Sequence, residues 1–155
     1  MTKGAFFSTD RAHRYLLLRV WDDTTPKVMF IGLNPSTANE TSDDATIRRV
    51  IRFAAKWGFG GVYMANCFSF VSTKPGDLQA NDSTEINDKI IQNWASECQE
   101  IIFAWGAFDI VKEKGRDKWL SEKFPDAEAL IINKDGSPRH PLYVKGDCIP
   151  VKFTV

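Results

Sequence analysis

The chain has 155 residues, of which 43% are hydrophobic and 26% charged, which is typical of a globular protein. Lysine plus arginine and aspartate plus glutamate number 20 each, so the formal net charge is zero. Tight non-specific DNA binders usually carry a basic surplus, because counterion release drives that binding. The chain lacks the basic surplus of tight non-specific DNA binders, so only a local basic patch would bind nucleic acid. This length suits one domain, which we expect to cover residues 1–155.

Two further features set the expected compartment. No apolar run approaches the ~20 residues that span a bilayer, and the N-terminal MTKGAFFSTDR lacks the apolar core of a secretion signal. We therefore expect a cytoplasmic protein with no membrane partner. Cys67, Cys98 and Cys148 lie far apart and form no Cys-x-x-Cys pair, so we expect reduced thiols and no metal or other cofactor.

The first half of the chain predicts two strands and a helix. RYLLLRVWDD (14–23) and KVMFIGL (27–33) are strand-like, and the second is apolar enough to be buried on both faces. The short turn between them predicts an antiparallel pair in which 27–33 is a central strand. Residues 43–57 then predict a helix that Thr41 or Ser42 caps and that Gly58 ends. Its apolar face comprises Ile47, Val50, Ile51, Ala54 and Trp57.

The second half alternates strands and helices. GGVYMAN (60–66), EIIFAWG (100–106) and AEALIIN (127–133) predict strands. Asp82 and Glu85 resemble a capping box for a helix with Ile86, Ile90, Trp94 and Cys98 on one face. A further helix is predicted over 107–121, weakened by Gly115. This alternation predicts a three-layer α/β/α domain with a mainly parallel four-stranded sheet plus an N-terminal antiparallel strand.

Ligands of such sheets bind at the carboxyl ends of the strands. That rule selects four segments, each of which follows a predicted strand. They are Asn34-Pro35-Ser36, Asn66-Cys67, Trp105-Gly106 and Arg139-His140-Pro141.

Two asparagines stand at predicted strand ends. The amide of Asn34 suits a water or a ligand edge, and Pro35 favours an extended backbone before it. Alternatively, Asn34 only bonds to the backbone of a helix-entry turn. Asn66 offers the paired donor and acceptor that read a base edge, or it simply forms a turn.

His140 is the stronger candidate of the two histidines, because we expect His13 to lie at the surface. An imidazole N–H stabilises a developing oxyanion, and Arg139 suits a phosphate. The alternative is a surface loop stiffened by Pro138 and Pro141.

Charged residues around the 43–57 helix allow two further interpretations. Glu40, Asp43 and Asp44 suit a Mg²⁺ site, although carboxylates at a helix N-terminus are more often explained by the helix dipole. Arg48 and Arg49 form either a solvated face or a modest phosphate-binding patch.

Four segments together resemble the uracil-DNA glycosylase superfamily over residues 28–144. VMFIGLNPS is similar to its first motif, and GVYMANCFSFV to a strand that ends on a base-reading Asn. IIFAWGAFDIVKEKG resembles a strand ending in a Gly that opens the next helix, and PRHPLYV partly matches the second catalytic motif, His-Pro-Ser-Pro-Leu. At closer range, LNPSTA, DDATIRR, AWG and DGSPRHPLYV resemble an uncharacterised bacterial and phage family, domain of unknown function 1643.

The superfamily resemblance implies a role for each matched residue. Asn34 would position the attacking water, Asn66 would read the base, and His140 would stabilise the departing base. Leu142 or Tyr143 would be the wedge that replaces a flipped nucleotide. Gly32, Leu33, Pro35 and Ser36 of the first motif, and Trp105, Gly106 and Pro141 of the later segments, would complete the ligand site. Arg139 has no counterpart in the second motif, and its expected phosphate contact rests on its own chemistry.

The chain departs from the superfamily pattern at several positions. Asn34 stands where the fastest members carry Asp, and Thr46 and Ile47 occupy the region of the aromatic residue that stacks on the base. The Ser-Pro of the second motif is missing as well.

From the resemblance as a whole we expect a nucleobase-binding domain, acting on modified DNA or a free nucleotide, that hydrolyses an N-glycosidic bond. The alternatives are a binding module without catalysis and a metal-dependent phosphohydrolase using Glu40, Asp43 and Asp44.

Overall fold

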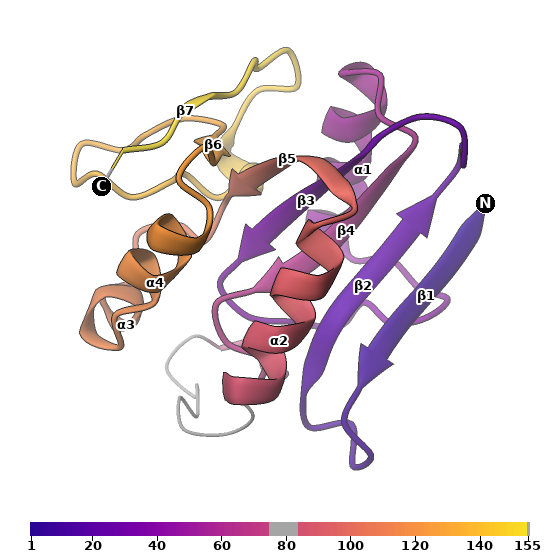
Figure 1. Cartoon of the computed structure of the whole chain (residues 1–155), viewed down its shortest axis with the longest axis horizontal. Coiled ribbons are helices and arrows are strands. Elements are labelled where there is room, and N and C mark those ends of the chain that lie inside the picture. Colours follow the sequence, from indigo (N-terminus) through magenta and orange to yellow (C-terminus); the bar gives the residue numbers. More distant parts are fainter. Residues whose placement is uncertain (75–83, 155) are drawn as a thin grey trace.

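One mixed seven-stranded sheet organises the chain, in the order β1-β2-β4-β3-β5-β6-β7 (Figure 1). The computed structural model describes residues 1–74 and 84–154. Strands β3, β4, β5 and β6 run parallel to one another, whereas β1, β2 and β7 pair antiparallel. The strands are β1 (Thr2–Phe7), β2 (Arg14–Val20), β3 (Lys27–Gly32), β4 (Gly61–Asn66), β5 (Cys98–Phe103), β6 (Glu128–Ala129) and β7 (Val151–Lys152).

Helices cover both faces of this sheet (Figure 1). They are α1 (Ala45–Lys56), α2 (Thr84–Ala95), α3 (Asp109–Glu113) and α4 (Arg116–Lys123), followed by the 3₁₀ helix η2 (Pro141–Tyr143). Because successive strand residues point to opposite faces, Val28 and Phe30 pack with α1, whereas Met29 and Ile31 belong to the core that α2, α3 and α4 cover. The domain is therefore α/β, as the alternation of elements predicts.

The predicted pairing of the first two apolar strands is wrong. β4 lies between β2 and β3, pairing antiparallel with β2 and parallel with β3. The turn after β2 folds over Gly60, which accepts hydrogen bonds from Trp21 N and Asp22 N and donates one to Pro26 O. A Cβ at Gly60 would collide with Thr25 Oγ1 and Asp22 O, so this crossing requires a glycine. The turn between β2 and β3 is short enough for a hairpin, yet β4, which comes later in the sequence, lies between these two strands.

The sheet also has more strands than predicted. β1 and β7 add antiparallel strands at its two edges, and the predicted strand 127–133 is reduced to the two residues of β6. Gly115, with φ of 67°, divides the predicted helix 107–121 into α3 and α4. Cys98, predicted on the apolar face of a helix, begins β5 instead.

Three other predictions concern the ends of elements and the membrane. The predicted cap of the first helix is wrong, because Asp44 caps α1 rather than Thr41 or Ser42. Asp82, the first residue of the predicted capping box, lies outside the described residues. Among the helices in the described ranges, none is both long and apolar enough to span a membrane.

Candidate functional site

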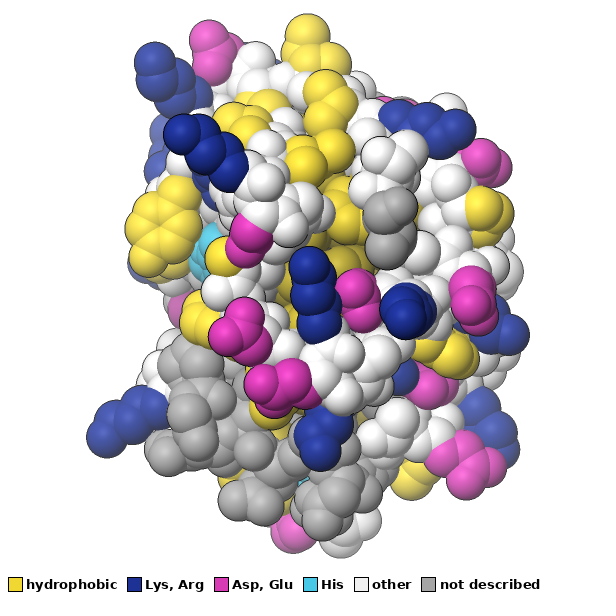
Figure 2. All heavy atoms as spheres, turned by 90° about the vertical axis from the view of Figure 1, so that its left-hand side faces the viewer, with side chains coloured by type: hydrophobic (Ala, Val, Ile, Leu, Met, Phe, Trp, Pro, Cys, Tyr) yellow, Lys and Arg dark blue, Asp and Glu magenta, His cyan; other side chains and the backbone are white. Residues whose placement is uncertain are grey.

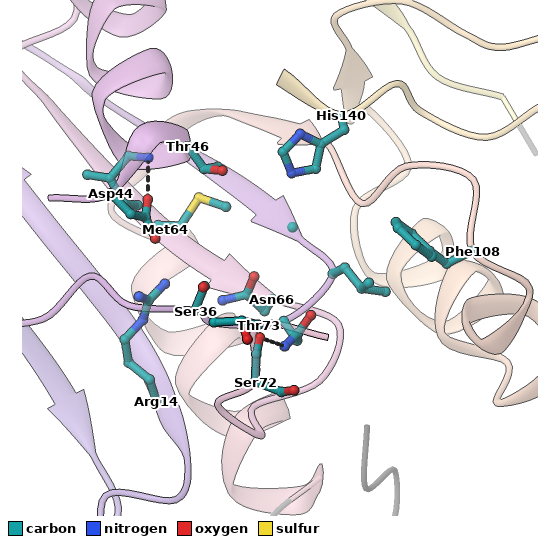
Figure 3. Close-up of a pocket in the computed structure, with 14 residues that line it drawn as sticks. Arg14, Ser36, Asp44, Thr46, Met64, Asn66, Ser72, Thr73, Phe108 and His140 are labelled. Atoms are coloured by element: carbon teal, nitrogen blue, oxygen red, sulfur yellow. Dashed lines mark hydrogen bonds between the residues drawn. The ribbon is translucent and has the colours of Figure 1, made fainter. Parts of the chain in front are cut away.

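A cavity of about 160 Å³ lies where β3 and β4 end and α1 begins (Figure 3). Its walls come from segments far apart in sequence, which the sheet topology brings together. The lining residues are Arg14, Gly32, Leu33, Asn34, Ser36, Asp44, Thr46, Ile47, Met64, Asn66, Ser72, Thr73, Phe108 and His140. The cavity thus unites Asn34, Asn66 and His140, which the sequence selects from three separate segments.

A second, larger hollow of about 490 Å³ adjoins this cavity. The two share Thr46, Phe108 and His140. The outer hollow is further lined by Gly106, Ala107, Asn133, Arg139, Leu142 and Tyr143. A ligand larger than the inner cavity therefore has room to extend past Phe108 and His140.

The amide of Asn34 is oriented by the backbone around it. Its Nδ2 donates hydrogen bonds to the carbonyls of Pro35 at 3.0 Å, Phe70 at 3.3 Å and Ser72 at 2.9 Å. Only the NH₂ group donates, so these carbonyls fix which way the amide faces. The NH₂ group of Asn34 is therefore bonded to backbone carbonyls, two of them in the loop after β4, whereas its Oδ1 accepts no hydrogen bond from a described side chain.

Asn66 ends β4 and is 2% exposed. Its backbone carbonyl accepts a hydrogen bond from Asn87 Nδ2 at 3.0 Å, but its own Nδ2 is buried without a hydrogen-bond partner among the described residues. A buried polar group usually has a partner, because its desolvation costs about 1–3 kcal/mol otherwise. An unpaired donor on the wall of a cavity therefore points to a ligand acceptor.

His140 precedes η2 and presents one ring nitrogen to the backbone. Its Nδ1 accepts a hydrogen bond from Leu142 N at 3.1 Å, which leaves Nε2 to carry the proton of the neutral ring. Burial lowers the pKa of His140 below its usual 6.5, and the charge of Asp44 opposes this only in part. His140 is therefore a neutral N–H donor at the boundary between the two hollows (Figure 3).

The loop after β4 ties the cavity to the N-terminal strands. His13, expected at the surface, is only 7% exposed, and its Nδ1 lies 2.7 Å from Ser69 Oγ. That expectation is wrong, because residues 67–72 fold back over the start of β2, where Arg14 N donates to Ser69 O.

The sequence predicts no ligand-binding role for three residues that line the cavity, Arg14, Phe108 and Thr46. Asp44 lines it as well and is considered above only for a metal site or for the helix N-terminus. Arg14 begins β2, where its neighbours give it the appearance of an ordinary strand residue. Phe108 lies between β5 and α3 and is 38% exposed, a large exposed aromatic side chain on the rim that both hollows share. Its position two residues after Gly106 is the one sequence clue, because that glycine follows a predicted strand.

Several predicted ligand-binding residues lie elsewhere. Trp105 is 2% exposed and packs against Phe103 and Phe153 in the core. Pro35 and Pro141 are buried and shape the backbone beside the cavity rather than line it. Arg48 and Arg49, on α1, line neither hollow. Arg139, Leu142 and Tyr143 belong to the outer hollow, where Arg139 Nε donates to Asn133 Oδ1 at 2.8 Å.

The three carboxylates considered for a metal site do not converge. Glu40 forms a two-pronged ion pair with Arg11, and Asp43 pairs with the buried Arg19 at 2.8 Å. Asp44 caps α1 by accepting a hydrogen bond from Ile47 N. Within the described residues, no group of three or more His, Cys, Asp or Glu side chains is arranged to hold a metal ion. The helix-stabilising interpretation of Asp44 is the one that the contacts support.

The face of the molecule at the carboxyl ends of the parallel strands, which Figure 2 shows, carries both acidic and basic side chains. Figure 2 shows acidic and basic side chains interspersed over it, around a strip of exposed hydrophobic side chains. No single basic patch gathers among the described side chains of this view. This pattern suits a small ligand or a weakly held nucleic acid better than a duplex held mainly through its phosphates.

Residues 14–142 match the model of a family described as a protein of unknown function, DUF1643. This match covers most of the chain, so the protein belongs to that family. No curated protein and no solved structure matches the chain.

Proposed function

We propose that the inner cavity binds a nucleobase-containing ligand, a modified base of DNA or a free nucleotide, and that the protein hydrolyses its N-glycosidic bond. The observation that carries this proposal is that Asn34, Asn66 and His140 line one cavity. The resemblance to the uracil-DNA glycosylase superfamily places its three main roles on these residues. A core of four parallel strands with helices on both faces suits that resemblance as well.

The proposed reaction is displacement of the base by water. Asn34 Oδ1 accepts a hydrogen bond from a water molecule, whose oxygen forms a bond to the sugar C1′ atom. The bond between C1′ and the base nitrogen breaks, and its electron pair leaves with the base. His140 Nε2–H donates to the negative charge that develops there. Asn34 is an amide and takes up no proton, so the proton of the water passes to solvent.

The remaining lining residues suit recognition of a base. Asn66 Nδ2, which lacks a hydrogen-bond partner in the part of the chain that the structure describes, donates to a base carbonyl. Phe108, on the shared rim, supplies the flat ring that the first motif lacks, although it comes from a different element. Leu142 and Tyr143 are 40% and 77% exposed, which suits a wedge at the mouth of the site.

A binding module without catalysis is the second candidate. The Nδ2 of Asn34 is engaged by three backbone carbonyls, and the residue lacks the carboxylate of the fastest superfamily members. A protein with this site would hold a nucleobase and release it unchanged. The phosphohydrolase alternative has no comparable support, because Glu40 and Asp43 are paired with arginines.

A base-release assay tests the proposal. Purified protein is incubated with single- and double-stranded DNA carrying modified bases and with free nucleotides, and released base is detected by mass spectrometry. We expect release from at least one substrate and its loss in Asn34→Ala and His140→Ala. Binding of a base-containing ligand without release supports the second candidate, whereas neither release nor binding contradicts both. Equal release by the wild type and both variants contradicts the assigned residues.

A further inference from the structure

Arg14 is a buried cation that forms no ion pair with a carboxylate among the described residues. The residue is 2% exposed, and its Nη1 donates to the Ala38 carbonyl at 3.1 Å. Its Nε is buried with no hydrogen-bond partner, and Arg14 takes part in none of the ion pairs among the described residues. Burial lowers the pKa of Arg14 to about 10, so the guanidinium stays protonated at neutral pH. Burying such a charge is costly unless a partner arrives.

The guanidinium belongs to the wall of the inner cavity. In Figure 3 it extends toward Asp44 and lies beside Ser36. The same cavity holds the second unpartnered donor, Asn66 Nδ2, and is bordered by the N-terminal turn of α1. Both of the buried side-chain atoms that line this cavity without a hydrogen-bond partner among the described residues are donors. The N-terminal end of α1, which favours anions, adds to the preference for a negatively charged ligand.

Asp44 is the carboxylate of this cavity and does not replace the missing partner. It raises the pKa of Arg14 through its charge, yet the two form no ion pair. One of its oxygens is held at the helix cap by Ile47 N at 2.9 Å. Asp44 therefore offsets part of the charge of Arg14 from a distance and would repel an anion bound next to it.

From this arrangement we infer that the ligand carries a compact oxyanion, a phosphate or a carboxylate, that binds against Arg14. The inference rests on the proposed function only in taking this cavity as the ligand site, and it adds the charge of the ligand. A nucleotide would supply the oxyanion as its phosphate, and a carboxylated base would supply it as its carboxylate. In both cases Arg14 provides charge-assisted hydrogen bonds, which are stronger than those between neutral groups.

Calorimetric titration of the wild-type protein tests the charge of the ligand and separates the two sources. The probes are inorganic phosphate, a nucleoside 5′-monophosphate with its nucleoside, and 6-carboxyuracil with uracil. We expect the charged member of at least one pair to bind roughly tenfold or more tightly than its neutral partner, the effect of a charged hydrogen bond. Equal affinity within both pairs, or no binding by any charged probe, overturns the inference.

Three variants then assign the effect to Arg14. Arg14→Gln is expected to weaken binding of the charged probe roughly tenfold or more, whereas Arg52→Gln, with the same change in charge at an exposed position outside both hollows, is expected to leave it unchanged. Asp44→Asn keeps a side chain that caps helices and is expected to strengthen binding. Equal weakening by Arg14→Gln and Arg52→Gln, or weakening by Asp44→Asn, overturns the inference. The Asp44→Asn result remains decisive should Arg14→Gln fail to fold.

The outcome is distinguishable from that of the base-release assay. If a charged probe binds in a way that depends on Arg14 but no base is released, the inference is supported. Only the catalytic part of the proposed function is then contradicted. Release of a base from a neutral substrate, unchanged in Arg14→Gln, supports the proposed function and contradicts the inference.

Discussion

Gly32 and Asn66 stand side by side at the ends of β3 and β4, where the parallel register pairs them directly. A Cβ on Gly32 would lie 2.8 Å from Asn66 Oδ1 and 2.7 Å from Met64 Cε. The missing side chain of Gly32 is thus what allows the Asn66 amide to occupy its place on the cavity wall. Gly32 therefore contributes to the site by leaving space for the side chain of Asn66.

Gly32→Ala is expected to displace the Asn66 amide and abolish ligand binding. The cost to stability is expected to be about 1–3 kcal/mol, the usual range for an overpacked position, since both atoms that must move are at the ends of side chains. Denaturant unfolding and calorimetric titration measure the two effects. Gly4→Ala is the control, because a Cβ there meets Leu18 at an ordinary contact distance of 3.4 Å. Ligand binding unchanged in Gly32→Ala would contradict the role given to Asn66.

Asn34→Asp is expected to destabilise the protein by about 1–3 kcal/mol at pH 7, because a carboxylate would face three backbone carbonyls without donating to them. The carbonyls disfavour the charged form, so the loss is expected to shrink at pH 4 as the carboxyl group becomes protonated. Denaturant unfolding at the two pH values measures this dependence.

Asn39→Asp is the matched control for that variant. Asn39 Oδ1 accepts hydrogen bonds from Thr41 N at 3.0 Å and Ser42 N at 2.9 Å, so a carboxylate retains these bonds. Equal destabilisation by both variants would show that the orientation of the Asn34 amide is not fixed by its donor group.

Phe108→Ala is expected to weaken binding of a base-containing ligand roughly tenfold to a hundredfold, because stacking of a base on an aromatic ring contributes about 1–3 kcal/mol. The melting temperature is expected to change little, since the ring is 38% exposed and belongs to neither core cluster. Phe108→Trp is expected to retain binding. A loss of affinity equal in both variants would favour a steric role at the rim over stacking.

Glu128 is expected to make stability fall as the pH rises. Burial, a hydrogen bond with the Glu100 side chain and the charge of Glu100 raise the pKa of Glu128 from 4.5 to about 7. The folded protein therefore keeps a proton between these pH values that the unfolded chain releases. The stabilising contribution is complete below about pH 4.5 and is lost as the pH rises through 7.

Glu128→Gln is accordingly expected to raise the melting temperature at pH 8 and to leave it nearly unchanged at pH 4. Glu122→Gln, an exposed residue of α4 with the same change in charge, is the control and is expected to show no such difference. A pH dependence of melting that is identical in the wild type and Glu128→Gln would contradict the prediction.

Local patterns in the sequence predict the elements better than their pairing. The apolar runs ending at Gly32 and Asn66 are strands, and the capped, amphipathic segment after Asp44 is α1. The pairing of β2 with β4 leaves no trace in the local pattern, because it depends on the turn that Gly60 allows the chain to make. The edge strands β1 and β7 are missed because an edge strand need not be apolar on either face, and most of their residues are exposed or only partly buried.

Local sequence patterns also predict some of the residues that line the cavity and miss others. Asn34 and Asn66 are polar residues at the ends of apolar segments, and His140 lies in the loop that follows another such segment, a pattern visible in the sequence alone. Arg14 and Phe108 reach the cavity from segments whose local pattern suggests a strand and a loop. Trp105 follows a strand just as Asn66 does, but its ring turns into the core.

An α/β domain, and the strand ends at which a ligand would bind, can be predicted from the amino-acid sequence, because hydrophobic periodicity and the positions of turn residues are local properties. Three features of the site depend on the folded arrangement. They are the three carbonyls around the Asn34 amide, the Asn66 donor with no partner among the described residues, and the buried Arg14 in the same cavity. Desolvation and hydrogen bonding depend on every segment packed around a group. The orientation and charge of this site therefore appear only when residues distant in the chain come together.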